Sequence, residues 1–119
     1  MILLDTHTLM WLLSGHKRAR RLPPRERLFV SPVTLLELRL LEEIGRFEIE
    51  SSARLEDDPR FAVDNPSSAA LFDAAARLPW TRDPFDRLVV GHALMRSWRL
   101  ATADTRILDY LPRESVFEI

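Results

Sequence analysis

Short apolar runs alternate with helix-forming segments along the chain of 119 residues. The runs at 2–4 and 28–30 are continuously apolar, which is typical of strands that are covered on both faces. We predict further strands at 99–102 and 116–119 and a weak strand at 61–63. Because strands and helices alternate in this way, the sequence predicts an α/β domain with a mainly parallel sheet.

Two of the predicted helices begin with favourable capping chemistry. Ser31-Pro32 opens a helix that we expect to run to about residue 44, before Gly45. Asp83-Pro84 opens another by the same logic, to about residue 98. Further helices are expected over 9–13 and 66–78, and a short one that ends at residue 110.

Composition narrows the class of protein. A chain of this length suits one compact domain over 1–119, and the absence of cysteine excludes disulfides, zinc-thiolate sites and thiol nucleophiles. The apolar run at 9–13 is too short to cross a bilayer, and no basic leader precedes residues 2–4, so we expect a cytoplasmic protein without a membrane partner. The net charge of −1 by itself speaks against a nucleic-acid binder, although basic residues concentrate between 17 and 27.

Acidic residues follow strands at two places and begin a helix at a third. Asp5 follows the strand at 2–4, Asp104 follows the strand at 99–102, and Asp83 and Asp86 lie at a helix start. In open α/β sheets, ligands bind outside the carboxyl ends of the strands, so these acids are expected to share one edge of the domain. Aspartate is also a favoured helix cap, which by itself explains Asp5 or Asp104 equally well.

Asp83 and Asp86 compete for one role. Asp83 is the expected N-cap, and Asp86 at the third helical position can reach back to the amide of the cap. However, Asp86 shares its helix face with Val89, Val90 and Ala93, which are expected to pack inward. We therefore interpret Asp86 as the active-site acid and Asp83 as a cap or supporting group.

Glu37 is the acid that capping does not explain. It falls within the apolar stripe of its helix that we expect to face inward, and a buried glutamate needs a partner or a metal. A salt bridge to an inward arginine remains an alternative, but we favour a functional carboxylate. The stripe consists of Val33, Leu36, Leu40, Leu41 and Ile44.

Four converging carboxylates would repel one another without a counter-ion. A hard divalent cation resolves this, because magnesium takes oxygen ligands together with substrate phosphate and manganese accepts similar ligands. Such an ion activates water and stabilises charge on a phosphodiester. The acids therefore indicate metal-dependent phosphate chemistry with Mg²⁺ or Mn²⁺.

Four stretches in this order resemble the PIN-domain nucleases, and more narrowly the VapC-type toxins of bacterial toxin–antitoxin modules. They are Leu3–His7, Ser31–Leu38, Arg82–Leu88 and Ala101–Asp104. The resemblance implies a three-layer α/β/α fold around a central, mainly parallel sheet of about five strands. It also implies magnesium- or manganese-dependent cleavage of RNA.

Carried over by position, the resemblance implies an acidic catalytic quartet. Thr6 and Thr102 resemble polar neighbours that hold metal-bound water, and Arg82 and Arg87 flank the acids as candidates for contact with RNA phosphate. The quartet is Asp5, Glu37, Asp86 and Asp104, of which Asp5, Asp86 and Asp104 are the expected metal ligands.

The expected function is that of a metal-dependent endoribonuclease and toxin. Such toxins are usually homodimers, and each is silenced by a small antitoxin that threads a segment across the active-site groove. Two alternatives stay open: a non-catalytic PIN-like module that acts through a protein partner, and another metal-dependent phosphohydrolase. Residues 48–64 match no motif and are expected to carry substrate or partner specificity.

Overall fold

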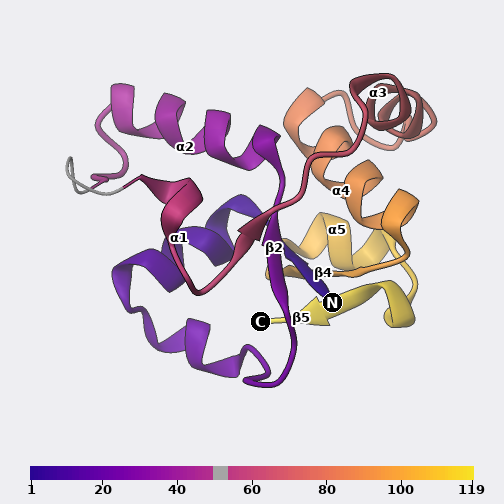
Figure 1. Cartoon of the computed structure of the whole chain (residues 1–119). Helices are drawn as coiled ribbons and strands as arrows, with labels where there is room; N and C mark the ends of the chain where they lie inside the picture. The colour runs from indigo at the N-terminus through magenta and orange to yellow at the C-terminus, as the bar shows by residue number, and fades with distance from the viewer. Residues whose placement is uncertain (50–53) are drawn as a thin grey trace.

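A parallel sheet of five strands forms the middle layer of the computed structural model, which describes residues 1–49 and 54–119 (Figure 1). All four pairings between neighbouring strands are parallel, in the order β3-β2-β1-β4-β5. The predicted α/β class with a parallel sheet is confirmed. The strands are β1 (Ile2–Leu4), β2 (Leu28–Val30), β3 (Ala62–Val63), β4 (Arg99–Thr102) and β5 (Val116–Glu118).

Helices cover both faces of the sheet. In Figure 1, α1 and α2 lie on one side and α4 and α5 on the other, with α3 packed on α4. No helix in the described part of the chain combines the length and the apolar character needed to traverse a bilayer. The helices are α1 (Thr6–Ser14), α2 (Pro32–Glu43), α3 (Ser68–Ala76), α4 (Pro84–Arg96) and α5 (Thr105–Tyr110), with short 3₁₀ helices η1 (Lys17–Arg21), η2 (Leu55–Asp57) and η3 (Arg113–Ser115).

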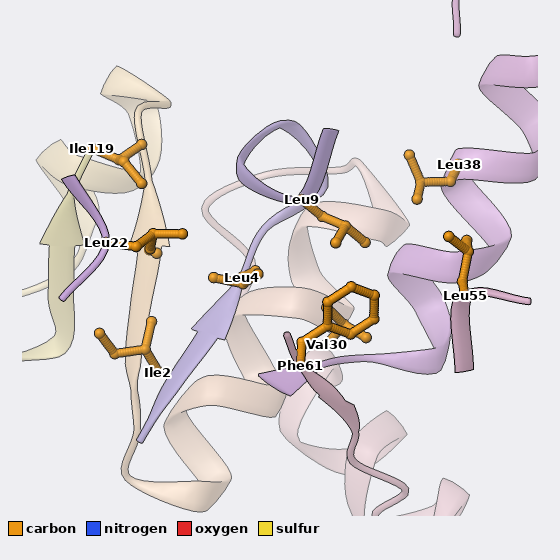
Figure 2. Close-up of a cluster of buried hydrophobic side chains, with 10 residues drawn as sticks. Ile2, Leu4, Leu9, Leu22, Val30, Leu38, Leu55, Phe61 and Ile119 are labelled. Carbon is orange, nitrogen blue, oxygen red and sulfur yellow. The ribbon is translucent and has the colours of Figure 1, made fainter. Parts of the chain in front are cut away.

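The hydrophobic core has two parts because successive side chains of a strand point to opposite faces. Ile2 and Leu4 of β1 belong to the cluster under α1 and α2, which Figure 2 shows. Leu3 belongs to the cluster under α4 and α5. β1 is the central strand of the sheet, and its three side chains are fully buried. Packing on both faces therefore holds the backbone at its carboxyl end in place.

The carboxyl end of β1 is the topological switch point of the sheet. From β1 the chain passes through α1 to β2 on one side, while β4, the other neighbour of β1, leads into α5 on the opposite face. Ligands of doubly wound sheets bind in the crevice at such a point. Asp5 directly follows β1, and Asp104 lies two residues after β4, at this edge.

Two expectations about helices were wrong. Helix α1 begins at Thr6 rather than at residue 9, because the Asp5 side chain accepts a hydrogen bond from the Thr8 amide (2.8 Å) and caps the first turn. In α2 the predicted inward stripe is largely exposed, with Leu36 at 55% and Ile44 at 65%, whereas Thr34 and Leu38 are fully buried. Helix α2 carries more apolar residues than one face holds, so packing against the sheet selects which of them face inward.

Candidate active site

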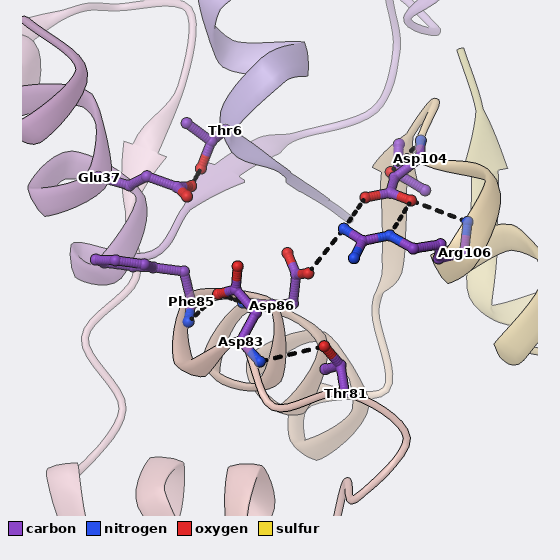
Figure 3. Close-up of polar contacts among 9 residues, drawn as sticks. Thr6, Glu37, Thr81, Asp83, Phe85, Asp86, Asp104 and Arg106 are labelled. Carbon is purple, nitrogen blue, oxygen red and sulfur yellow. Dashed lines mark hydrogen bonds and ion pairs between the residues drawn. The ribbon is translucent and has the colours of Figure 1, made fainter. Parts of the chain in front are cut away.

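A pocket of about 170 Å³ opens at the switch point, between the beginnings of α1, α4 and α5 and the middle of α2. Five carboxylates line it, so the structure brings the four predicted acids and Asp83 together. Figure 3 labels Glu37, Asp83, Asp86 and Asp104 among them. The lining residues are Asp5, Thr6, His7, Glu37, Asp83, Phe85, Asp86, Val89, Asp104, Arg106 and Ile107.

A larger cavity of about 600 Å³ lies elsewhere, beside the end of α1 and η2. Its lining includes Leu13, Phe47 and Ile49 and none of the four predicted acids. The smaller pocket gathers all four of them, so it is the candidate active site.

Two acids of the pocket are fixed by the helices they cap. Asp5, which is nearly buried, accepts the Thr8 amide, and Asp104 accepts the amide of Arg106 at 2.9 Å. Thr102 is fully buried and does not line the pocket, but its hydroxyl oxygen accepts a hydrogen bond from the Asp104 amide (3.0 Å). Thr102 therefore orients the backbone at Asp104. Capping and a place in the pocket are compatible for both acids.

Asp83 is the cap of α4 and also lines the pocket. Its Oδ1 accepts hydrogen bonds from the amides of Phe85 (2.8 Å) and Asp86 (3.2 Å). Asp86 lies in the same first turn with its side chain about one-fifth exposed, and Val89, Val90 and Ala93 on its face are buried. Asp83 is the cap, as expected, and both acids line the pocket.

Burial and the neighbouring negative charges both change the pKa of the Asp86 carboxyl. Burial raises its pKa first of all, and the neighbouring carboxylates of Asp83, Asp104 and Glu37 raise it further against the opposing charge of Arg106. Together these effects bring the pKa of Asp86 to about 6. The cluster is therefore short of positive charge.

Arg106 is the cation of this pocket, and the sequence interpretation missed it. One Nη2 atom lies 3.1 Å from Asp104 Oδ2 and 3.2 Å from Asp86 Oδ2, so the guanidinium bridges the two acids. Burial acts to raise the pKa of Asp104, but the hydrogen bonds and charge of Arg106 outweigh burial and hold this pKa below its usual range. The signal was its position two residues after a capping aspartate, where the side chain can fold back.

Glu37 reaches the pocket from α2 and is held by a hydroxyl group. Thr6 at the start of α1 donates a hydrogen bond to Glu37 Oε1, as Figure 3 shows. Across the described ranges 1–49 and 54–119, no salt bridge to Glu37 is present. The alternative of an inward arginine partner therefore finds no support in the structure.

The remaining predicted residues lie outside the pocket lining. Arg87 Nε donates to the carbonyl oxygen of Thr81 (2.6 Å) and anchors the loop before α4, and Arg82 is exposed. His7, Phe85 and Arg106 line the pocket instead. Unlike Arg106, His7 and Phe85 carry no spacing signal that separates them from ordinary surface residues.

The donor chemistry of the pocket fits a hard divalent cation. Its ligands would be carboxylate oxygens, and five carboxylates line the pocket beside a single arginine. Within the described residues no three acidic or histidine side chains are yet arranged to hold a metal ion, and Arg106 lies between Asp86 and Asp104. The residues fit the ion in the chemistry of their donors, and Asp5, Asp86 and Asp104 would hold it.

Comparison with known proteins connects this chain to one family. A family model described as PIN domain matches residues 2–111. The chain is 29% identical over 118 residues to Ribonuclease VapC22 of Mycobacterium tuberculosis, with 89% of this chain and 88% of that protein covered.

Solved structures share the fold. A toxin-antitoxin complex from Klebsiella pneumoniae matches with a TM-score of 0.69 and 22% identity over 100% of both chains. VapBC2 from Rickettsia felis, bound to a DNA fragment from its promoter, matches with a TM-score of 0.67 and 14% identity over 100% of this chain and 99% of that chain. At these identities the likeness concerns the path of the chain, and it extends over the whole of it.

Proposed function

The chain belongs to the PIN-domain family, and from this premise we propose that it is a metal-dependent endoribonuclease and the toxin of a toxin–antitoxin pair. One observation carries the proposal: five carboxylates converge at the switch point of the sheet, where burial and then the neighbouring carboxylates raise the pKa of Asp86 to about 6. The relative named Ribonuclease VapC22 supports RNA as the substrate class.

Asp5, Asp86 and Asp104 are the proposed ligands of Mg²⁺ or Mn²⁺. When bound, the ion supplies Lewis-acid activation of water and stabilises charge on the phosphodiester. The chain fixes two of these ligands in advance, because Asp5 and Asp104 are held by the first turns of α1 and α5. Thr102 and Asp83 support the set through the backbone amides of Asp104 and Asp86.

Glu37 is the proposed proton acceptor. Thr6 donates a hydrogen bond to its Oε1 atom, and the Glu37 carboxylate lines the pocket, where it would take a proton from the attacking water. A base placed within hydrogen-bond reach typically contributes about 10²- to 10⁴-fold to rate. Arg82, which is exposed beside the pocket, and Arg87 are proposed to contact RNA phosphate during binding rather than in the pocket itself.

We propose two protein partners, an antitoxin and a second copy of this chain. The matched complexes are described as toxin-antitoxin and VapBC assemblies, which supports a small antitoxin protein as the partner of this chain. We also propose that residues 1–119 form a single PIN domain and that two copies of the chain form a homodimer. The proposed place of action on RNA is the cytoplasm. Residues 48–64 remain a proposed specificity segment, of which residues 50–53 lie outside the described part of the chain.

The test is RNA cleavage by purified protein that has been freed of any partner. We expect cleavage with added magnesium or manganese and none with a chelator. Asp5→Asn should abolish cleavage while circular dichroism shows an intact fold, and Asp57→Asn, at a side chain that is 74% exposed on η2, is the matched control. An Asp5→Asn variant that cuts as fast as the wild type would disprove the mechanism.

The other two readings are outcomes of the same assay. A non-catalytic module would bind a partner but leave RNA intact under every metal condition. A different phosphohydrolase would release phosphate from a chromogenic phosphomonoester while sparing RNA.

A further inference from the structure

Arg106 is the only lysine or arginine among the residues that line the acidic pocket. It makes three contacts with Asp104, through its amide at 2.9 Å, Nε at 3.4 Å and Nη2 at 3.1 Å, and one with Asp86 at 3.2 Å. The same guanidinium thus neutralises two of the acids that the metal would need. Figure 3 shows it between the two carboxylates.

The Arg106 guanidinium is placed so that it can move away from the two carboxylates. The Arg106 side chain is 63% exposed, and it begins in the first turn of α5 at the rim of the pocket. Asp104, in contrast, caps the first turn of α5, and the Asp86 side chain is only 20% exposed, so the guanidinium is the movable partner.

We propose that Arg106 is the internal counter-ion of the metal-free site and that a divalent cation binds by displacing it from Asp86 and Asp104. This inference rests on the proposed metal-dependent function and adds a competitor to it. Both cations seek the same carboxylate oxygens, so the affinity for metal is set by the difference between two interactions. The arginine keeps the acidic cluster folded without metal and raises the metal concentration at which the site fills.

Titration calorimetry with Mn²⁺ tests the exchange without any assay of activity. We expect Arg106→Ala to bind Mn²⁺ about fourfold more tightly than the wild type, since each of the two exposed ion pairs that the metal no longer has to break is worth roughly a factor of two. Arg106→Lys should fall between the two, because lysine keeps the charge but lacks the planar fork that bridges two acids. Arg106→Gln is a second neutral variant in case the alanine variant folds poorly.

Arg113→Ala is the matched control. It removes an exposed arginine from η3, which follows α5, outside the pocket lining. We expect its affinity for Mn²⁺ to stay within about twofold of the wild type, because charges this exposed are screened by salt. A rise equal to that of Arg106→Ala would reduce the effect to net charge and overturn the exchange.

Thermal unfolding gives a second measure. Without metal, Arg106→Ala should unfold at a lower temperature than the wild type, and saturating Mn²⁺ should raise its midpoint by more, because ligand stabilisation grows with affinity. Equal or weaker Mn²⁺ binding by Arg106→Ala than by the wild type would overturn the inference while the proposed metal dependence stands. If neither protein binds Mn²⁺ and the wild type does not cleave RNA, the proposed function fails as well.

Discussion

The imidazole Nε2 of His92 lies 2.7 Å from the Oδ2 atom of Asp64, a contact that fastens α4 to the residue after β3. Arg96 Nε lies 2.8 Å from the same oxygen. His92 is fully buried, and burial lowers its pKa, so the neutral ring donates to the carboxylate. Helix α4 also carries Asp86, and this contact therefore fixes the orientation of a helix that supplies the active site.

Asp64→Asn is expected to lower the free energy of unfolding by about 1–3 kcal/mol, because His92 and Arg96 would lose their charged acceptor in a largely buried place. Burial acts to raise the pKa of Asp64, but its hydrogen bonds from Arg96 and His92 prevail and keep this pKa below its usual range, so the carboxylate is charged at neutral pH. Urea unfolding at about pH 7.5 measures the change. The exposed Asp57→Asn variant should change stability by less than about 0.5 kcal/mol, and an equal loss in both variants would contradict the argument.

Asp86→Asn is expected to stabilise the metal-free protein at about pH 7.5. The folded pKa of about 6 exceeds the ordinary value of 3.8, so the folded protein holds the proton more strongly and the Asp86 carboxyl costs stability once it ionises. The gain is on the order of 2 kcal/mol, since a pKa unit corresponds to about 1.4 kcal/mol and the side chain keeps some contact with solvent.

The pH dependence of this gain provides its own control. The stabilising effect should shrink as the pH falls through 6 towards 4, because the wild-type carboxyl is then protonated in the folded protein. Denaturant unfolding at several pH values without metal measures the difference. A variant that is less stable than the wild type at neutral pH would show that the pair with Arg106 outweighs the crowding of negative charge.

Thr6→Ala is expected to slow RNA cleavage about 10- to 100-fold, because a misplaced catalytic group is costly even when the displacement is small. The Thr6 hydroxyl donates to Glu37 from the adjacent helix. The effect should appear in kcat rather than KM, since Thr6 positions Glu37 and does not hold the rest of the RNA. Thr6→Ser keeps the hydroxyl and should cleave RNA nearly as fast as the wild type. If Thr6→Ser and Thr6→Ala cleave at the same rate, the hydroxyl of Thr6 does not position Glu37.

The starts of α2 and α4 could be predicted because their causes are local, whereas α1 begins at Thr6 rather than at residue 9. Asp5, Asp83 and Asp104 are recognisable as caps from sequence alone, and parallel strands then place acids after strand ends at one edge of the sheet. The alternation of apolar runs and capped helices likewise predicts the order of strands and helices.

The inward face of α2 could not be predicted, because Leu36 and Leu38 are equally apolar and only the tertiary packing leaves the first exposed and buries the second. The partners of the charged groups were also hidden. Asp64 and His92 are 28 residues apart, and Arg106 reaches back 20 residues to Asp86, so neither pair leaves a local pattern. Glu37 does line the pocket, as predicted, but the prediction rested on an inward-facing apolar stripe of α2 that is largely exposed.

Gly91→Ala is expected to destabilise the protein by about 1–3 kcal/mol, the usual cost of overpacking. In an ordinary helix the same change stabilises by roughly 0.5–1 kcal/mol, because glycine loses more conformational freedom on folding. At Gly91 of α4 an added Cβ would lie 3.0 Å from the Ala75 amide nitrogen and 3.2 Å from the Ala74 carbonyl carbon of α3. Backbone atoms cannot rotate away as a side chain can, so α3 would have to shift and the sign of the effect reverses.

Ser97→Gly at the end of the same helix is the control, because Ser97 has a φ of 56° that favours glycine and its replacement should stabilise. Thermal unfolding of the two variants should therefore move in opposite directions, and a stabilised Gly91→Ala variant would mean that α3 and α4 are not in backbone contact there.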